Sequence, residues 1–216
     1  MNAIDLIGVS KMIKGSAVLQ DINLRMEGGK IYGLVGRNGS GKTMLLRMLA
    51  GLIRPTAGKI HYENDLADGA KIGITIENPL FYPAFTGYKN LMFLANINKY
   101  AGAAEVRRAL GEVGLDPDDP RVVRKYSLGM KQRLGIAQAL MENPDYLFLD
   151  EPTNALDEEG IDRIRNLILR QAERGATVVV ASHSKEEIAV LCDKLYFMKK
   201  GRIATETEIT GKEVMR

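Results

Sequence analysis

The chain has 216 residues, of which 45% are apolar and 26% charged, as in an ordinary globular protein with a sizeable core. Its single cysteine, Cys192, excludes an internal disulfide, and a net charge of only +3 from scattered basic residues argues against a nucleic-acid partner. No apolar run approaches the roughly 18 residues of a membrane span, and the start does not resemble a signal peptide, so we expect a cytoplasmic protein that meets a membrane only through another chain.

The first part of the chain is predicted to consist mainly of strands. Within 18–26, apolar Ile22, Leu24 and Met26 alternate with polar residues, which is the pattern of a half-buried strand. In chain order, we expect strands at 2–9, 18–26 and 30–35, a helix at 44–50, and strands at 59–62 and 72–76.

From about residue 79 to residue 143 the pattern becomes helical. Leu91, Leu94 and Ala95 share one face of a predicted helix, and the last helix stops before Pro144 because the residue before a proline disfavours the helical conformation. This region is therefore predicted to be an inserted helical lobe. Its helices are expected at 87–100, 103–113 and 128–142, with a break at 116–120.

Strands and helices then alternate again, which predicts a parallel sheet with ligands at the C-terminal ends of its strands. We expect one domain, 1–216, whose α/β core is 1–78 and 144–216 and whose lobe is 79–143. The remaining elements are a strand at 146–149, a helix at 158–173, a strand at 177–181, a helix at 185–191, a strand at 193–198, a turn at 199–201 and a last short strand.

A glycine-rich loop follows the strand at 30–35 and precedes the helix at 44–50. Residues 36–43 fit G-x-x-x-x-G-K-[ST], in which backbone N–H groups surround a polyphosphate and a helix start adds positive charge. Lys42 is expected to reach the β- and γ-phosphates, and Thr43 to offer a hydroxyl to Mg²⁺. The alternative is a chance turn, which the flanking strand and helix disfavour. The expected nucleotide-binding residues of the loop are Gly36, Asn38, Gly39, Ser40, Gly41, Lys42 and Thr43.

Three other polar side chains follow predicted strands. Asp150 can hold Mg²⁺ through water, and the adjacent Glu151 can polarise an attacking water as a general base. The alternative for both carboxylates is an ordinary acidic strand exit. A lone histidine is more often structural, but His183 should lie on the same rim as Lys42, where it could bond the γ-phosphate.

Ser127 precedes the helix expected at 128–142. Serine is a favourable N-cap, and a helix start that carries a hydroxyl suits an anion. A plain helix cap is the alternative, which spacing alone does not exclude.

Taken in order, these motifs resemble the ATP-binding subunit of ABC transporters over nearly the whole chain. The resemblance implies an ABC-type P-loop NTPase fold, which is α/β with a mostly parallel central sheet, an N-terminal antiparallel β part and an inserted helical lobe. It also implies that the chain binds ATP and Mg²⁺ and hydrolyses ATP. The motifs are the phosphate loop 36–43, the signature-like stretch 126–133, the strand with its carboxylates 146–151, the stretch 154–157 and His183.

The resemblance implies a head-to-tail dimer of two copies, with ATP between the phosphate loop of one copy and the signature helix of the other. Ser127 and Gly129 would contact the γ-phosphate bound by the opposite copy, and Asp157 would help to link the two sites. Closure on ATP and opening after hydrolysis would drive a membrane permease, which would hold the chain at the inner face of the cell membrane.

Three departures from the family pattern stand out. Ile13 replaces the aromatic residue that usually stacks on adenine, which leaves simple apolar contact. The stretch 126–130 reads Tyr-Ser-Leu-Gly-Met and so keeps the serine and second glycine of Leu-Ser-Gly-Gly-Gln but not the first glycine or the glutamine. Glu77 replaces a loop glutamine, and its carboxylate can contact Mg²⁺ but adds negative charge near the phosphates.

The stretches 76–83 and 126–133 resemble the branch that exports, or gives immunity to, peptide antibiotics of the bacitracin and lantibiotic type, unless they mark ancestry alone. We therefore expect an ATPase subunit that powers export of a drug or peptide-antibiotic-like substrate through a separate permease. A non-transport ABC ATPase of the cell-division type is the alternative. A regulator without turnover is disfavoured because both Glu151 and His183 are present.

The surface at about 77–100 is expected to receive a cytoplasmic helix of the permease. Phe81, Tyr82 and Phe85 are candidates for that contact, or for packing within the lobe.

Overall fold

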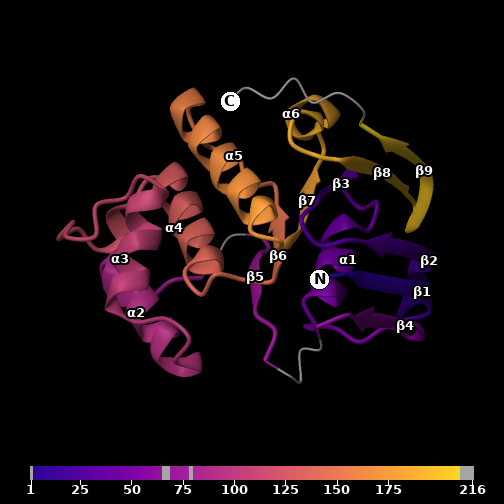
Figure 1. Cartoon of the computed structure of the whole chain (residues 1–216), viewed down its shortest axis with the longest axis horizontal. Coiled ribbons are helices and arrows are strands. Elements are labelled where there is room, and N and C mark those ends of the chain that lie inside the picture. Colours follow the sequence, from indigo (N-terminus) through magenta and orange to yellow (C-terminus); the bar gives the residue numbers. More distant parts are fainter. Residues whose placement is uncertain (1, 65–68, 78–79, 210–216) are drawn as a thin grey trace.

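The computed structural model describes residues 2–64, 69–77 and 80–209. Figure 1 shows two sheets on one side of the molecule and the helical lobe on the other. The lobe holds α2 (Gly87–Asn98), α3 (Ala103–Glu112) and α4 (Leu128–Leu140), and α5 (Glu158–Glu173) lies between α4 and the sheets. Among the described residues, no helix has the length and apolar character needed to cross a lipid bilayer.

The larger sheet is mostly parallel, as predicted. Its strands in the described chain are β3 (Ile31–Val35), β5 (Ile72–Thr75), β6 (Tyr146–Asp150), β7 (Thr177–Ser182), β8 (Lys194–Lys199) and β9 (Arg202–Glu208). They lie in the order β5-β6-β7-β3-β8-β9, and β9 alone among them runs antiparallel to its neighbour. The C-terminal ends of β3, β6 and β7 therefore meet at one edge, where the predicted site residues follow them.

The smaller sheet is antiparallel and consists of β2 (Ser16–Met26), β1 (Ile4–Ile13) and β4 (Ala57–Tyr62), in that order. Strand β1 runs beyond the expected 2–9 because it continues into a tight hairpin with β2. Lys14 (φ 46°) and Gly15 (φ 80°) form its turn, with the positive φ angles that two-residue hairpins favour. Register shifts along β1 interrupt the alternation that would have marked its second half.

The helices lie close to the positions predicted from periodicity. Helix α1 (Lys42–Leu49) begins within the glycine-rich loop. Helix α6 (Lys185–Ala189) is shorter than the expected 185–191 because the chain tightens into a turn at its end, where the Leu191 N–H donates to the Ile188 carbonyl three residues back (3.0 Å). The division of core from lobe near residue 79 stays a prediction, since Asn78 and Pro79 lie outside the described residues.

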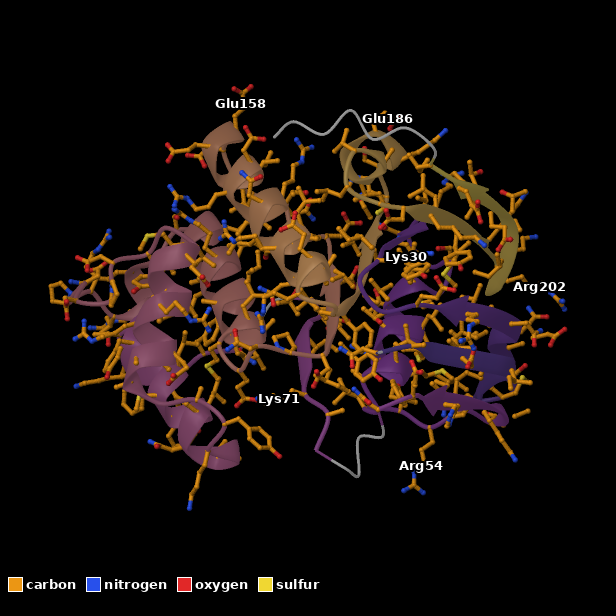
Figure 2. All side chains as sticks on the ribbon, in the orientation of Figure 1. Lys30, Arg54, Lys71, Glu158, Glu186 and Arg202 are labelled. Carbon is orange, nitrogen blue, oxygen red and sulfur yellow. The ribbon has the colours of Figure 1, made fainter. Side chains whose placement is uncertain are left out.

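The central strands β3, β6 and β7 of the larger sheet are buried on both faces. In β7, Val178 and Val180 join the core shared with the lobe and α5, whereas Val179 and Ala181 join the core around α1 and the smaller sheet. This division follows the two-residue period of a strand. Charged side chains labelled in Figure 2, such as Glu158 and Arg202, project outward instead. The larger sheet is therefore packed between two cores, and these fix the position of the sheet edge at which the candidate site residues lie.

Candidate nucleotide-binding site

The phosphate loop wraps closely around an open centre between β3 and α1. Gly39 (φ 78°) and Gly41 (φ 108°) adopt left-handed conformations that other residues rarely reach. A Cβ on Gly36 would lie 2.6 Å from both the Met198 carbonyl oxygen and the Ser40 hydroxyl oxygen, so a larger residue would not fit there. No side chain caps the start of α1, which leaves its first N–H groups for an anion.

Two polar side chains of this loop, Ser40 and Lys42, are buried. Lys42 is 6% exposed, and its Nζ donates to the Gly36 carbonyl across the loop (2.5 Å). The Ser40 hydroxyl is buried and has no hydrogen-bond partner within the described chain. Buried polar groups usually find partners, so an unsatisfied hydroxyl at the loop fits a site that takes a polar ligand.

The residues expected to hold a metal ion lie together. Thr43 on α1 donates its hydroxyl hydrogen to Asp150 Oδ2 at the end of β6 (2.6 Å). Burial raises the pKa of Asp150, and the neighbouring Glu151 carboxylate adds to this rise, while the Thr43 hydroxyl opposes it. A half-buried carboxylate beside a hydroxyl is a set of hard oxygen donors, which suits Mg²⁺. A cation would also offset the cost of burying this carboxylate.

Glu151 and His183 are in direct contact. Glu151 Oε1 accepts from the His183 backbone N–H (2.9 Å) and lies 2.9 Å from His183 Nδ1, while Oε2 accepts from the Ser182 hydroxyl (3.2 Å). Ser182 ends β7 and His183 follows it, so adjacent parallel strands bring these groups together as predicted. The His183 side chain is 56% exposed and so remains open to a ligand.

Glu77 follows β5 and forms an ion pair that the sequence did not reveal. Its Oε1 lies 2.7 Å from Nη2 of Arg47 on α1, and its side chain is 64% exposed. The extra negative charge introduced by this glutamate is therefore matched by a neighbouring positive charge. Arg47 lies one helical turn beyond Thr43 on α1, and no local pattern in the sequence pairs it with Glu77.

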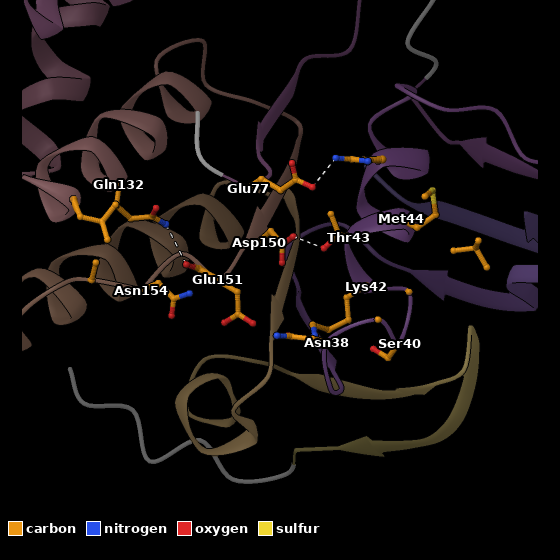
Figure 3. A pocket seen from close by; sticks show the side chains of 16 residues that line it. Asn38, Ser40, Lys42, Thr43, Met44, Glu77, Gln132, Asp150, Glu151 and Asn154 are labelled. Carbon is orange, nitrogen blue, oxygen red and sulfur yellow. Dashed lines mark hydrogen bonds and ion pairs between the residues drawn. The ribbon is translucent and has the colours of Figure 1, made fainter. Parts of the chain in front are cut away.

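Most of these groups line a cavity of about 660 Å³, shown in Figure 3, whereas Gly36 and His183 are not among its lining residues. Its walls include the phosphate loop, Glu77, Asp150 and Glu151 on the core side, and Leu128 and Gln132 of α4 on the lobe side. The sequence did not identify Gln132 as a site residue. It lies one turn inside its helix, and only the start of that helix carries a signal for anion binding. Val18 was also missed, since it reaches the cavity through the fold of the β1–β2 hairpin and carries no local signal.

The other predicted site residues do not line this cavity in the described structure. Ile13, 38% exposed, ends β1 outside it. Ser127 caps α4 by accepting from the Met130 N–H (3.2 Å), and Asp157 caps α5 by accepting from the Gly160 N–H (3.1 Å). A Cβ on Gly129 would lie 2.6 Å from the Ala155 carbonyl oxygen. Their contacts with nucleotide or with a second copy stay predictions.

Comparison with known proteins supports the predicted resemblance. The model of the ABC transporter family matches residues 19–154. The chain is 43% identical over 215 residues to the uncharacterized ABC transporter ATP-binding protein YybJ of Bacillus subtilis (strain 168), covering 97% of this chain and 99% of that protein. It is 40% identical to the bacitracin transport ATP-binding protein BcrA of Enterococcus faecalis, covering 96% of this chain and 70% of that protein.

Solved structures agree with these relatives. The dimeric structure of MJ0796, a bacterial ABC transporter cassette, superposes with a TM-score of 0.86 at 28% identity, covering 96% of this chain and 99% of that one. MJ0796 in a post-hydrolysis state bound to ADP and Pi gives a TM-score of 0.85 at the same identity and coverage. The predicted fold class is confirmed, and so is the resemblance to the bacitracin and lantibiotic branch. The chain belongs to the ABC transporter family, as an ATP-binding subunit with ATPase activity.

Proposed function

We propose that this ATPase works as a head-to-tail dimer and drives export of a drug or peptide-antibiotic-like substrate through a separate membrane permease. The observation that carries the dimer is that the phosphate loop and both carboxylates line the cavity, whereas Ser127 of the same copy lies outside it. A second copy would supply the missing serine. That MJ0796 forms a dimer, and that BcrA serves bacitracin transport, supports this assignment.

Within one copy, the loop residues Gly36 to Thr43 bind the phosphates of ATP. The Lys42 ammonium exchanges the Gly36 carbonyl for phosphate oxygens, a charge-assisted bond that is stronger than the one it leaves. The Ser40 hydroxyl gains a partner in the same way. Val18, which lines the cavity, and Ile13, which lies outside it, would offer only apolar contact to the base, so selection among nucleotide bases is expected to be loose.

Thr43 and Asp150 would hold Mg²⁺, with Glu77 as a third oxygen donor that shares its charge with Arg47. When bound, the metal would neutralise negative charge on the β- and γ-phosphates. Side chains of this chain carry out the proton transfer and orient the reacting groups.

Glu151 is the general base. Its carboxylate takes a proton from the attacking water as the water oxygen bonds to the γ-phosphorus, and the bond from the γ-phosphorus to the ADP oxygen breaks. The contacts from Ser182 and His183 fix the orientation of that carboxylate. His183, half exposed beside it, bonds the γ-phosphate and loses that contact on hydrolysis. Ser127 and Gly129 act on the ATP of the opposite copy, and Asp157 links the two sites.

A second depression, of about 330 Å³, is the proposed seat of the permease helix. It lies between residues 80–83 and the start of α4, and its lining combines apolar side chains with the cations Arg124 and Lys131. Leu80 on its wall is 99% exposed, which is unusual for so large an apolar residue. Phe81 lines this groove, whereas Tyr82 and Phe85 pack their rings together 5.4 Å apart.

Purification of the tagged chain from native membranes tests the partner. We expect a membrane protein with several spans to co-purify, and substitution of Leu80 by a charged residue should reduce its recovery. A partner that acts in cell division would support the alternative function instead. Recovery without any membrane protein, under conditions that retain other complexes, would contradict the proposal.

A further inference from the structure

Glu151 has an unusual backbone conformation that needs support. Its φ angle of 48° lies in the left-handed region, which costs free energy for a residue with a side chain. Hydrogen bonds hold the peptide there. The Glu151 N–H donates to the Ala181 carbonyl of β7 (2.9 Å), and its carbonyl accepts from the Asn154 N–H (3.2 Å) and from Gln132 Nε2 (3.1 Å).

Gln132 differs from the other two anchors in its origin. Ala181 and Asn154 belong to the sheet and to the turn that follows it, but Gln132 comes from α4 in the helical lobe. Figure 3 shows its side chain reaching from that helix to Glu151. The proposed general base is thus tied by one neutral side chain to a helix that also carries Ser127 at its start.

Gln132 also borders two spaces at once. It lines the 660 Å³ nucleotide cavity and the 330 Å³ groove on the other side of the helix start. A movement of α4 relative to the sheet would therefore pull directly on the Glu151 peptide. Misplacing a catalytic group by about 1 Å can lower a rate about 100-fold, so such a link is large enough to matter.

We propose that Gln132 is a positioning residue for Glu151, through which the helical lobe sets where the general base lies. This inference rests on the proposed role of Glu151. The amide suits this task because it donates a hydrogen bond without adding a charge beside the carboxylates.

Gln132→Met keeps the length of the side chain but removes the donor. We expect turnover to fall about tenfold, since one hydrogen bond that fixes the base is lost. The KM for ATP and the Kd for a non-hydrolysable ATP analogue should stay within about twofold, because the amide that is removed donates to the Glu151 carbonyl. Gln132→Glu, which replaces the donor with an acceptor, should show the same loss, and Gln132→Lys, which keeps a donor, should recover most of the rate.

Gln138→Met is the matched control, since Gln138 lies further along α4 and away from both spaces. Thermal unfolding of each variant separates a local effect from loss of the fold. An equal loss in Gln138→Met, a change confined to KM and Kd, or unchanged turnover in both Gln132→Met and Gln132→Glu would overturn the inference.

A double variant separates this inference from the proposal on which it rests. If Gln132 acts through Glu151, adding Gln132→Met to Glu151→Gln should cost little further turnover. Normal hydrolysis by Glu151→Gln alone would remove the general base and with it the inference. An inactive Glu151→Gln together with a fully active Gln132→Met would leave the base in place and refute the role of Gln132 alone.

Discussion

The two sides of the nucleotide cavity are organised differently. On the core side, Lys42, Thr43 and Glu151 each have a hydrogen-bond partner from another part of the loop or sheet, so their positions are set within one copy. On the lobe side, Leu128 lines the cavity and is exposed, and the adjacent Ser127, which lies outside the cavity, accepts from its own helix. The core side is prepared for ATP, whereas the lobe side presents a surface that fits a contact with a second copy.

Replacing the proposed base should have the largest effect. Glu151→Gln keeps the shape of the core side but removes the proton acceptor, so turnover should fall by about 100-fold or more while ATP still binds. Because ATP then persists, the two copies should stay associated, which size-exclusion chromatography with and without ATP can measure. Turnover near the wild-type rate would show that another group activates the water.

Lys42→Ala should weaken phosphate binding on the core side without changing the lobe side. Loss of a charge-assisted bond to phosphate should lower ATP affinity by about 10- to 100-fold. Fluorescence titration with a labelled nucleotide measures this directly. If affinity is unchanged, the phosphates bind elsewhere and the assignment of the loop is wrong.

Ser127→Ala tests the lobe side alone. Nucleotide affinity of a single copy should be unchanged, while turnover, which needs the second copy, should fall about tenfold. Loss of the helix cap should also cost about 1 kcal/mol of stability. The control variant is Thr86→Ala. It removes a similar cap, since Thr86 accepts from the Lys89 N–H (3.2 Å) at the start of α2. Equal turnover losses in the two variants would reduce Ser127 to a structural cap.

Asp150→Asn should reveal the cost of burying charge on the core side. Burial raises the pKa of Asp150, so the folded state binds the proton of this carboxyl group more tightly than the unfolded state does. The free energy of unfolding therefore declines as the pH rises through the pKa of Asp150 in the folded state. At neutral pH the nucleotide-free variant should therefore unfold a few degrees higher than wild type, and this gain should shrink toward pH ~4. Lower stability of the variant at every pH would mean that the bond from Thr43 outweighs burial.

The parts of the site predicted best are those set by local sequence. The loop 36–43 lies between a strand and a helix. Asp150 ends β6 and His183 follows β7, and the C-terminal ends of these strands must meet in a parallel sheet. Contacts that depend on how separate elements pack could not be predicted from the sequence. Val18 reaches the cavity because a hairpin folds over the loop, and Gln132 does so because α4 packs against β5, the neighbour of β6.

The β1–β2 hairpin also shows why alternation of apolar and polar residues does not always predict where a strand ends. Strand β1 extends to Ile13 although alternation fails after Val9, because register shifts move its side chains between faces. The ion pair of Glu77 with Arg47 joins two elements that are distant in sequence, so only the fold could reveal it. The pair changes the interpretation of Glu77, since the charge of this residue is already partly compensated before any metal binds.

The most direct test of the dimer is a cross-link between the two sides of different copies. One tagged copy would carry Ser127→Cys and an untagged copy Asn38→Cys, both with Cys192→Ser and Glu151→Gln, and a short bifunctional thiol reagent would join them. We predict a cross-linked pair of one tagged and one untagged chain that forms with ATP and is largely absent without it. A cross-link yield that does not respond to ATP, with ATP binding intact, would contradict the account.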